Sequence, residues 1–171
     1  MGKTLKCLWL LVVIVFHVGG CQSDELPSVV DDTCIPSGLT CEHFLLRPLE
    51  VADAEADFEA VLESKSELRA LFGSDWPEDG FTLDQNRAEL AEHQRAFREN
   101  ESFTYAVVAN DRQRILGSVY ILPAEDGDAN VYYWIRTSEH GSGIAQELQL
   151  ALKDWLASDW WFGRVTFHGT K

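Results

Sequence analysis

Apolar and polar residues recur along this chain with two different periods. Alternating or continuous apolar runs, typical of β-strands, occupy residues 43–49, 103–109, 115–122, 131–136 and 162–168. Apolar residues at helical spacing occupy residues 51–72, 82–99 and 143–157. The resulting order is strand, two helices, a hairpin of two strands, strand, helix, strand. This order predicts an α/β (α+β) fold, in which a mixed twisted sheet is flanked by helices.

Turn-forming and capping residues separate these segments. Pro48 ends the first strand because proline cannot donate a ladder hydrogen bond. Gly73 is a candidate C-cap of the first helical region. Thr82 followed by Gln85 has the spacing of a capping box and predicts the start of the second helix. His93 falls on the polar side of that helix.

Composition and charge indicate an acidic globular protein. The chain has 171 residues, 46% of them hydrophobic and 25% charged, with a formal net charge of −14. A nucleic-acid partner would require clustered Lys and Arg to neutralise phosphates, and this chain has no such run. An acidic surface favours solubility and could attract a cationic substrate such as an amine.

The N-terminal residues have the three-part layout of an export signal. Lys3 and Lys6 are followed by an apolar run over residues 7–18 and by two glycines before Cys21. The run Val18-Gly19-Gly20-Cys21 resembles a bacterial lipobox, so residues 1–20 are predicted to be a signal segment and Cys21 a lipidation site in the cell envelope. Two alternatives remain open: an ordinary secretory signal, or a misassigned start codon with a cytoplasmic protein.

Residues 21–42 are polar and turn-forming, and they predict a tether ahead of a domain over residues 43–171. Cys34 and Cys41 bracket six residues of this tether. Outside the cytoplasm they could close a small disulfide loop, and two free thiols are the alternative. No Cys/His set has the spacing of a metal site.

A glycine pair follows the strand over residues 131–136. The run His140-Gly141-Ser142-Gly143-Ile144-Ala145 predicts a turn that opens a helix. Such a turn leaves backbone N–H groups free beside the positive end of the helix dipole, which suits a phosphate or pyrophosphate. A helix start without a ligand is the plainer interpretation.

This run, within the element order given above, resembles the GNAT acetyltransferase family. The coenzyme A loop of that family reads Arg/Gln-x-x-Gly-x-Gly/Ala, and here His140 stands at the Arg/Gln position. The strand ending in Trp134-Ile135-Arg136, the first strand and Gly117 in the hairpin also look like this family. The resemblance covers residues 43–168.

The resemblance implies an N-acetyltransferase that moves an acetyl group from acetyl-CoA to a small-molecule or protein amine by direct attack. It implies a pyrophosphate site on His140, Gly141, Ser142, Gly143, Ile144 and Ala145, and a pantetheine contact with the backbone of Trp134, Ile135 and Arg136. A general base must accept the amine proton. The candidates near the strand are Tyr133 and Glu125, with Asp126 and Tyr132 as alternatives.

The usual fold of the family continues with a helix and two strands that this sequence lacks. We therefore expect a natural short form, with a truncated chain as the alternative, and a homodimer could protect the uncovered sheet edge. The export signal and the missing elements also suggest a second function, a non-catalytic binding or assembly module of an envelope lipoprotein.

Overall fold

The structure, a computed structural model, describes residues 35–112 and 114–170. Its centre is a six-stranded sheet whose strands lie side by side in chain order. The strands are β1 (Leu39–Thr40), β2 (Phe44–Pro48), β3 (Phe103–Ala109), β4 (Ile115–Pro123), β5 (Ala129–Ile135) and β6 (Val165–Gly169). The helices are α1 (Ala54–Glu63), α2 (Lys65–Phe72), α3 (Leu83–Arg98) and α4 (Ile144–Asp159), with short 3-10 turns η2 (Val51–Asp53), η3 (Glu125–Gly127) and η4 (Thr137–Glu139).

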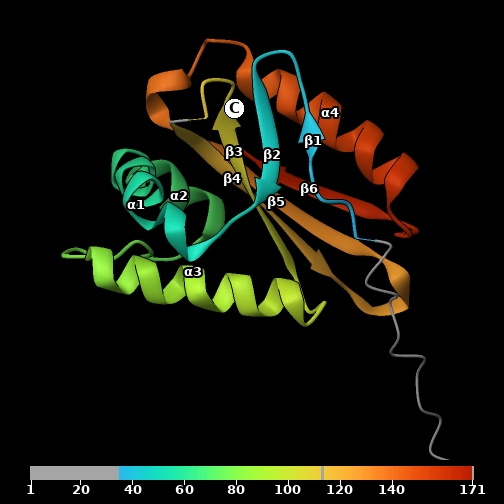
Figure 1. The fold of residues 1–171 in the computed structure, drawn as a ribbon, viewed down its shortest axis with the longest axis horizontal. Helices are drawn as coiled ribbons and strands as arrows, with labels where there is room; N and C mark the ends of the chain where they lie inside the picture. The colour runs from blue at the N-terminus through green and yellow to red at the C-terminus, as the bar shows by residue number, and fades with distance from the viewer. Residues whose placement is uncertain (1–34, 113, 171) are drawn as a thin grey trace, which may run out of the picture.

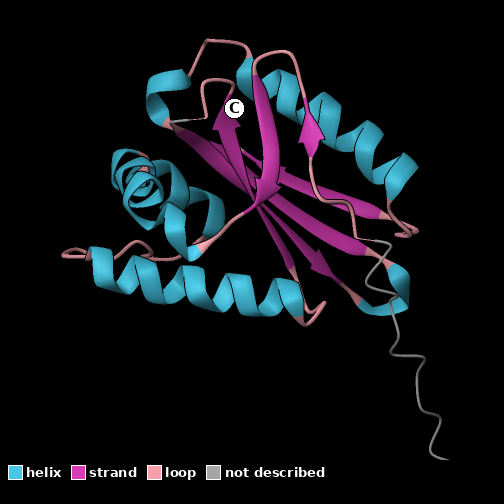
Figure 2. Cartoon of the chain, viewed as in Figure 1, coloured by secondary structure: helices cyan, strands magenta, loops and turns pink. Residues whose placement is uncertain are grey.

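The sheet is mixed. Each pair from β1 to β5 is antiparallel, and β6 runs parallel to β5. A parallel neighbour requires a crossover connection, which α4 supplies. Helix α4 covers one face of the sheet, and α1, α2 and α3 cover the other (Figure 1; Figure 2). The predicted mixed sheet with flanking helices is therefore confirmed.

Each face of the sheet has its own hydrophobic core because side chains alternate along a strand. Tyr105 and Val107 of β3 pack with Leu152 of α4. Their neighbours Ala106 and Val108 pack beneath α1, α2 and α3. Strand β3 thus reads as a continuous apolar run because both of its faces are covered.

The first helical region differs from its prediction. Residues 51–72 form η2, α1 and α2 rather than one helix, and the break between α1 and α2 falls at Ser64. The buried Ser64 side chain accepts a hydrogen bond of 3.2 Å from the backbone N–H of Thr137, in the turn after β5. A contact with a residue so distant in sequence leaves no trace in helical periodicity.

The strand boundaries also shift. Strand β5 begins at Ala129, inside the predicted acidic loop, and β6 begins at Val165 instead of residue 162. Phe162 instead stacks on Trp160, with ring centroids 5.4 Å apart, in an aromatic cluster that precedes β6. The C-cap at Gly73 and the capping box of Thr82 and Gln85 are confirmed.

Several predictions concern the N-terminal part of the chain. Strand β1 adds two residues of the predicted tether to the sheet. The signal segment, Cys21 and Cys34 lie outside the described residues. Burial raises the pKa of the half-buried Cys41 thiol, and the nearby Glu147 carboxylate adds to the shift. Its disulfide with Cys34 stays a prediction. No helix in the described part of the chain combines the length and apolar character of a membrane span.

Candidate active site

The glycine motif forms the turn between β5 and α4. Gly141 and Gly143 have φ angles of 84° and 91°, in the left-handed region that favours glycine. A Cβ atom added to either residue would meet no described atom within 4 Å, so this side of the turn is open. The backbone N–H groups of Gly141, Gly143, Ala145 and Gln146 donate no hydrogen bond to any described residue. Unpaired amides at the start of a long helix form an anion site.

The other amides of the motif hold the turn itself. The N–H of His140 donates to the carbonyl of Thr137, and that of Ser142 to the carbonyl of Glu139, each over 3.1 Å. The N–H of Ile144 donates to Oγ of Ser142 over 3.3 Å. Half of the predicted loop amides therefore shape the turn, and the other half are free to meet a pyrophosphate.

A carboxylate at the end of α1 anchors this turn. Glu63 Oε2 accepts hydrogen bonds from Nε and Nη2 of Arg136 at 2.9 and 2.5 Å, and its Oε1 accepts one from the N–H of Ser138 at 2.6 Å. Burial alone would raise the pKa of Glu63, but these hydrogen bonds outweigh it and lower the pKa to about 2. The Arg136 side chain, only 10% exposed, thus pairs with Glu63. We call this pair the Glu63–Arg136 clamp.

The backbone N–H groups at the end of β5 donate hydrogen bonds to the chain segments on both sides of this strand. The N–H of Arg136 donates to the carbonyl of Leu116 at 2.7 Å, beside β4. The N–H of Ile135 faces the other way and donates to Oγ1 of Thr170 at 3.2 Å, just past β6. Trp134 is fully buried. Of the three predicted pantetheine contacts, Ile135 therefore presents its amide on the β6 side.

Two of the cavities at this edge of the sheet are lined in part by residues of α2. One, of about 470 Å³, is lined by Glu67, Leu71, His140, His168 and Thr170, among others. The second, of about 510 Å³, is lined by Leu71, Phe72, Trp76, Glu89, His93, Tyr120, Leu122, Tyr132 and His168, and we call it the aromatic pocket. Because both cavities include Leu71 and His168 in their lining, they adjoin each other, and we call the two together the groove between the glycine turn and the aromatic pocket.

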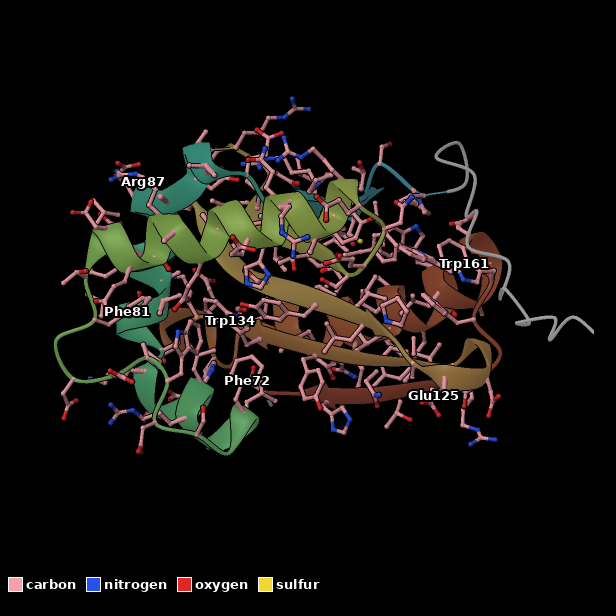
Figure 3. The ribbon with its side chains drawn as sticks, turned by 90° about the horizontal axis from the view of Figure 1, so that it is seen from below. Phe72, Phe81, Arg87, Glu125, Trp134 and Trp161 are labelled. Carbon is pink, nitrogen blue, oxygen red and sulfur yellow. The ribbon has the colours of Figure 1, made fainter. Side chains whose placement is uncertain are left out.

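The predicted base candidates lie in different parts of the molecule. Tyr133 is 4% exposed and packs in the core beneath α4, where it lines a third cavity together with Ala145 and Gln146, and burial raises its pKa. Glu125 and Asp126 lie in η3, at the opposite end of β5 from the glycine turn, about 20 Å away at the usual rise per residue. Figure 3 shows Glu125 far from Phe72 of the aromatic pocket. Tyr132, by contrast, lines that pocket.

Comparison with known proteins identifies the family of this chain. The family described as acetyltransferase (GNAT) domain matches residues 43–168. The chain belongs to the GNAT acetyltransferase family. No curated protein sequence matches this GNAT chain. The match confirms the predicted resemblance to the GNAT acetyltransferase family over residues 43–168.

Solved GNAT structures share the fold. They include the ribosomal-protein-S5-alanine acetyltransferase of Vibrio fischeri (18% identity, TM-score 0.54, covering 70% of this chain and 66% of that one). RimL, the ribosomal L7/L12 α-N-protein acetyltransferase, in complex with coenzyme A, has 21% identity and a TM-score of 0.57, with 74% and 70% covered. The microcin C7 self-immunity acetyltransferase MccE, in complex with acetyl-CoA and AMP, has 15% identity and a TM-score of 0.65, with 80% and 76% covered. This GNAT chain thus spans about two thirds of the Vibrio fischeri protein.

Several residues of this site were not predicted from the sequence pattern. Glu63, Glu89 and His168 belong to three different elements, and no spacing in the sequence relates them. His93 lines the aromatic pocket, although helical periodicity placed it on the polar side. The described residues contain no group of three His, Cys, Asp or Glu side chains that could hold a metal ion.

Proposed function

We propose that this chain transfers the acetyl group of acetyl-CoA to a primary amine in the groove between the glycine turn and the aromatic pocket. The observation that carries the proposal is the row of unpaired amides beside a cavity that adjoins a second, aromatic cavity. One part of this groove suits an anionic cofactor, and the other suits an organic acceptor.

Within this proposal, the amides of Gly141, Gly143 and Ala145 hold the pyrophosphate. Ile135, whose N–H now donates to Thr170, is assigned to the pantetheine arm or the thioester carbonyl. An N–H aimed at that carbonyl would stabilise the negative charge that develops on its oxygen. Acetyl-CoA supplies an activated acetyl group as a thioester.

His168 is our candidate for the general base. It lines both cavities and stacks on Tyr132, with ring centroids 4.5 Å apart and planes inclined by 15°. An imidazole can accept and release a proton at physiological pH, which suits proton transfer. The neutral amine attacks the thioester carbonyl carbon, a C–N bond forms and the C–S bond breaks. The proton leaving nitrogen passes through His168 to the thiolate, giving an amide and free coenzyme A.

The acceptor is proposed to be an amine on a small molecule or a protein. Support for a protein acceptor comes from relatives that modify ribosomal proteins, including the S5-alanine and L7/L12 enzymes. The aromatic pocket supports a small-molecule acceptor, since it is a cavity of about 510 Å³ with mostly apolar walls.

The test is a titration of the full-length protein with acetyl-CoA by calorimetry, followed by measurement of free coenzyme A in the presence of amines. Gly143→Asp places a negative charge at the pyrophosphate site and should weaken binding about tenfold or more. Gly127→Asp is the matched control, since Gly127 also has a positive φ, of 77°, and open space around it, but lies in η3. No binding by the wild type at millimolar acetyl-CoA would contradict the proposal and favour the non-catalytic module.

We further propose that Cys21 carries a lipid anchor in the cell envelope. The basic residues Lys3 and Lys6, the apolar run after them and the sequence Val18-Gly19-Gly20-Cys21 support this proposal. Membrane fractionation of wild type and Cys21→Ala, with a palmitate label, tests it. A wild-type protein that is soluble and unlabelled would exclude the anchor.

We also propose a homodimer that covers the β6 edge. In the described sheet, β6 has one neighbour, β5, so its other edge offers unpaired backbone groups. Light scattering at several concentrations tests this proposal, and a monomer at all of them would refute it.

A further inference from the structure

The walls of the aromatic pocket indicate the class of acceptor. Phe72, the last residue of α2, contacts three other aromatic side chains of the pocket lining. Its ring centroid is 5.7 Å from that of Trp76 and 5.8 Å from those of Tyr120 and Tyr132. Aromatic faces carry partial negative charge and attract cations, especially away from bulk water. A site of this kind suits an organic cation with an aliphatic body.

One carboxylate completes the far wall. Both oxygens of Glu89 accept a hydrogen bond from the indole N–H of Trp76, at 3.1 Å each. Glu89 is partly buried, and burial raises its pKa. His93, one turn later on α3, contacts Oγ1 of Thr104 through Nδ1 at 3.2 Å, and burial lowers its pKa, which favours the neutral ring.

The pocket therefore has a charged end and a reactive end. No Lys or Arg is among the described residues that line it. His168 marks the end that opens toward the glycine turn. Contacts run from His168 to Tyr132, from Tyr132 to Phe72, from Phe72 to Trp76 and from Trp76 to Glu89. The carboxylate thus lies several side chains away from the place where we put the reaction.

We propose that the aromatic pocket binds an aliphatic diamine as the acetyl acceptor. One nitrogen, as an ammonium ion, lies against Glu89 and the aromatic faces of Trp76 and Phe72. The other nitrogen, in its neutral form, meets the thioester beside His168 and becomes the amide. The net charge of −14 favours the approach of such a cation. This inference rests on the proposed acetyl transfer and specifies its acceptor.

The test compares three primary amines with four carbon atoms each and a different far end: 1,4-diaminobutane, butylamine and 4-aminobutyrate. With the full-length protein and saturating acetyl-CoA, kcat/KM from coenzyme A release should be about tenfold higher for the diamine than for butylamine. It should be lowest for 4-aminobutyrate, whose carboxylate would face Glu89. This comparison uses wild-type protein, so it does not depend on any variant folding.

Two variants of α3 then test whether Glu89 causes the preference for the diamine. Glu89→Gln should reduce the preference for the diamine over butylamine to about twofold or less, with the affinity for acetyl-CoA unchanged. Glu92→Gln, which changes an exposed acid of the same helix, should keep the full preference. Equal rates for the three amines, or turnover of an amino-terminal peptide without turnover of the diamine, would overturn the diamine proposal. Absence of acetyl-CoA binding would instead overturn the proposed function itself.

Discussion

Replacing Glu63 by glutamine tests how the cofactor turn is held. The substitution removes the charge that pairs with the nearly buried Arg136 and weakens the bond to the N–H of Ser138. The fall in the pKa of Glu63 from an ordinary 4.5 to about 2 sets an upper limit of about 3 kcal/mol on the stabilisation. The Glu63 side chain is 30% exposed, so solvent screening reduces this to about 1–2 kcal/mol.

We therefore expect Glu63→Gln to lower the Tm by about 3–8 °C at neutral pH, measured by scanning calorimetry. Because Arg136 and Ser138 begin the turn, we also expect the Kd for acetyl-CoA to rise about five- to tenfold. Glu63→Asp, which keeps the charge on a shorter side chain, should fall between the wild type and the glutamine variant.

The pH dependence follows from the direction of the shift. A carboxyl whose pKa is lowered by folding contributes its full stabilisation above its unfolded pKa, near 4.5, and loses it as pH falls toward 2. The difference in stability between wild type and Glu63→Gln should therefore be constant from pH 6 to 8 and shrink steadily below about pH 4.5. Urea unfolding at a series of pH values measures it.

The matched control is Glu59→Gln, which changes an exposed glutamate of the same helix. This control should leave both Tm and Kd at wild-type values. If the Glu63 and Glu59 variants were indistinguishable in both measurements, the Glu63–Arg136 clamp would play no part in holding the turn.

Three further predictions concern the fold. Folding raises the pKa of the buried Asp57, which accepts a hydrogen bond from Asn86, to about 6, mainly through burial. The stabilisation from its proton is complete below pH 3.8 and is lost as pH rises through 6. Asp57→Asn should thus be about 1–3 kcal/mol more stable than wild type at pH 7.5 and equally stable near pH 3.5, by urea unfolding. Gly117→Ala should cost about 3 kcal/mol or more in the same assay, because its Cβ would lie 1.9 Å from the carbonyl oxygen of Trp134; a neutral result would contradict the close approach of β4 and β5. Leu152→Ala, in the core beneath α4, should lower the Tm by an amount equivalent to about 2–5 kcal/mol, and a loss under 1 kcal/mol would mean a looser core.

Local physics explains which parts of the fold could be predicted. The capping box of Thr82 and Gln85 acts over three residues, and the apolar run of β3 over seven, so a short window of sequence contains the whole interaction. The same holds for the glycine turn. Its left-handed residues and its position before a helix are both properties of adjacent residues.

The rest depends on contacts between distant residues. The break at Ser64 is held by a hydrogen bond from Thr137, 73 positions away. The aromatic pocket draws Phe72, Glu89 and His168 from separate elements, and each has an ordinary structural explanation when taken alone. Helical periodicity assigns His93 a side of its helix but cannot show that the end of α2 and β4 enclose that side.

The six strands lie in the sheet in the same order as in the sequence, and this affects how the domain can fold during synthesis. Each strand from β2 to β5 can pair with a partner already made as the chain leaves the ribosome, because its neighbour precedes it in the sequence. Strand β6 must wait for α4 to fold and cross over. His168 arrives on that last strand, so the nascent domain would complete its glycine turn before the wall that carries the proposed base. We expect ribosome-bound chains arrested before β6 to bind coenzyme A weakly and to transfer no acetyl group.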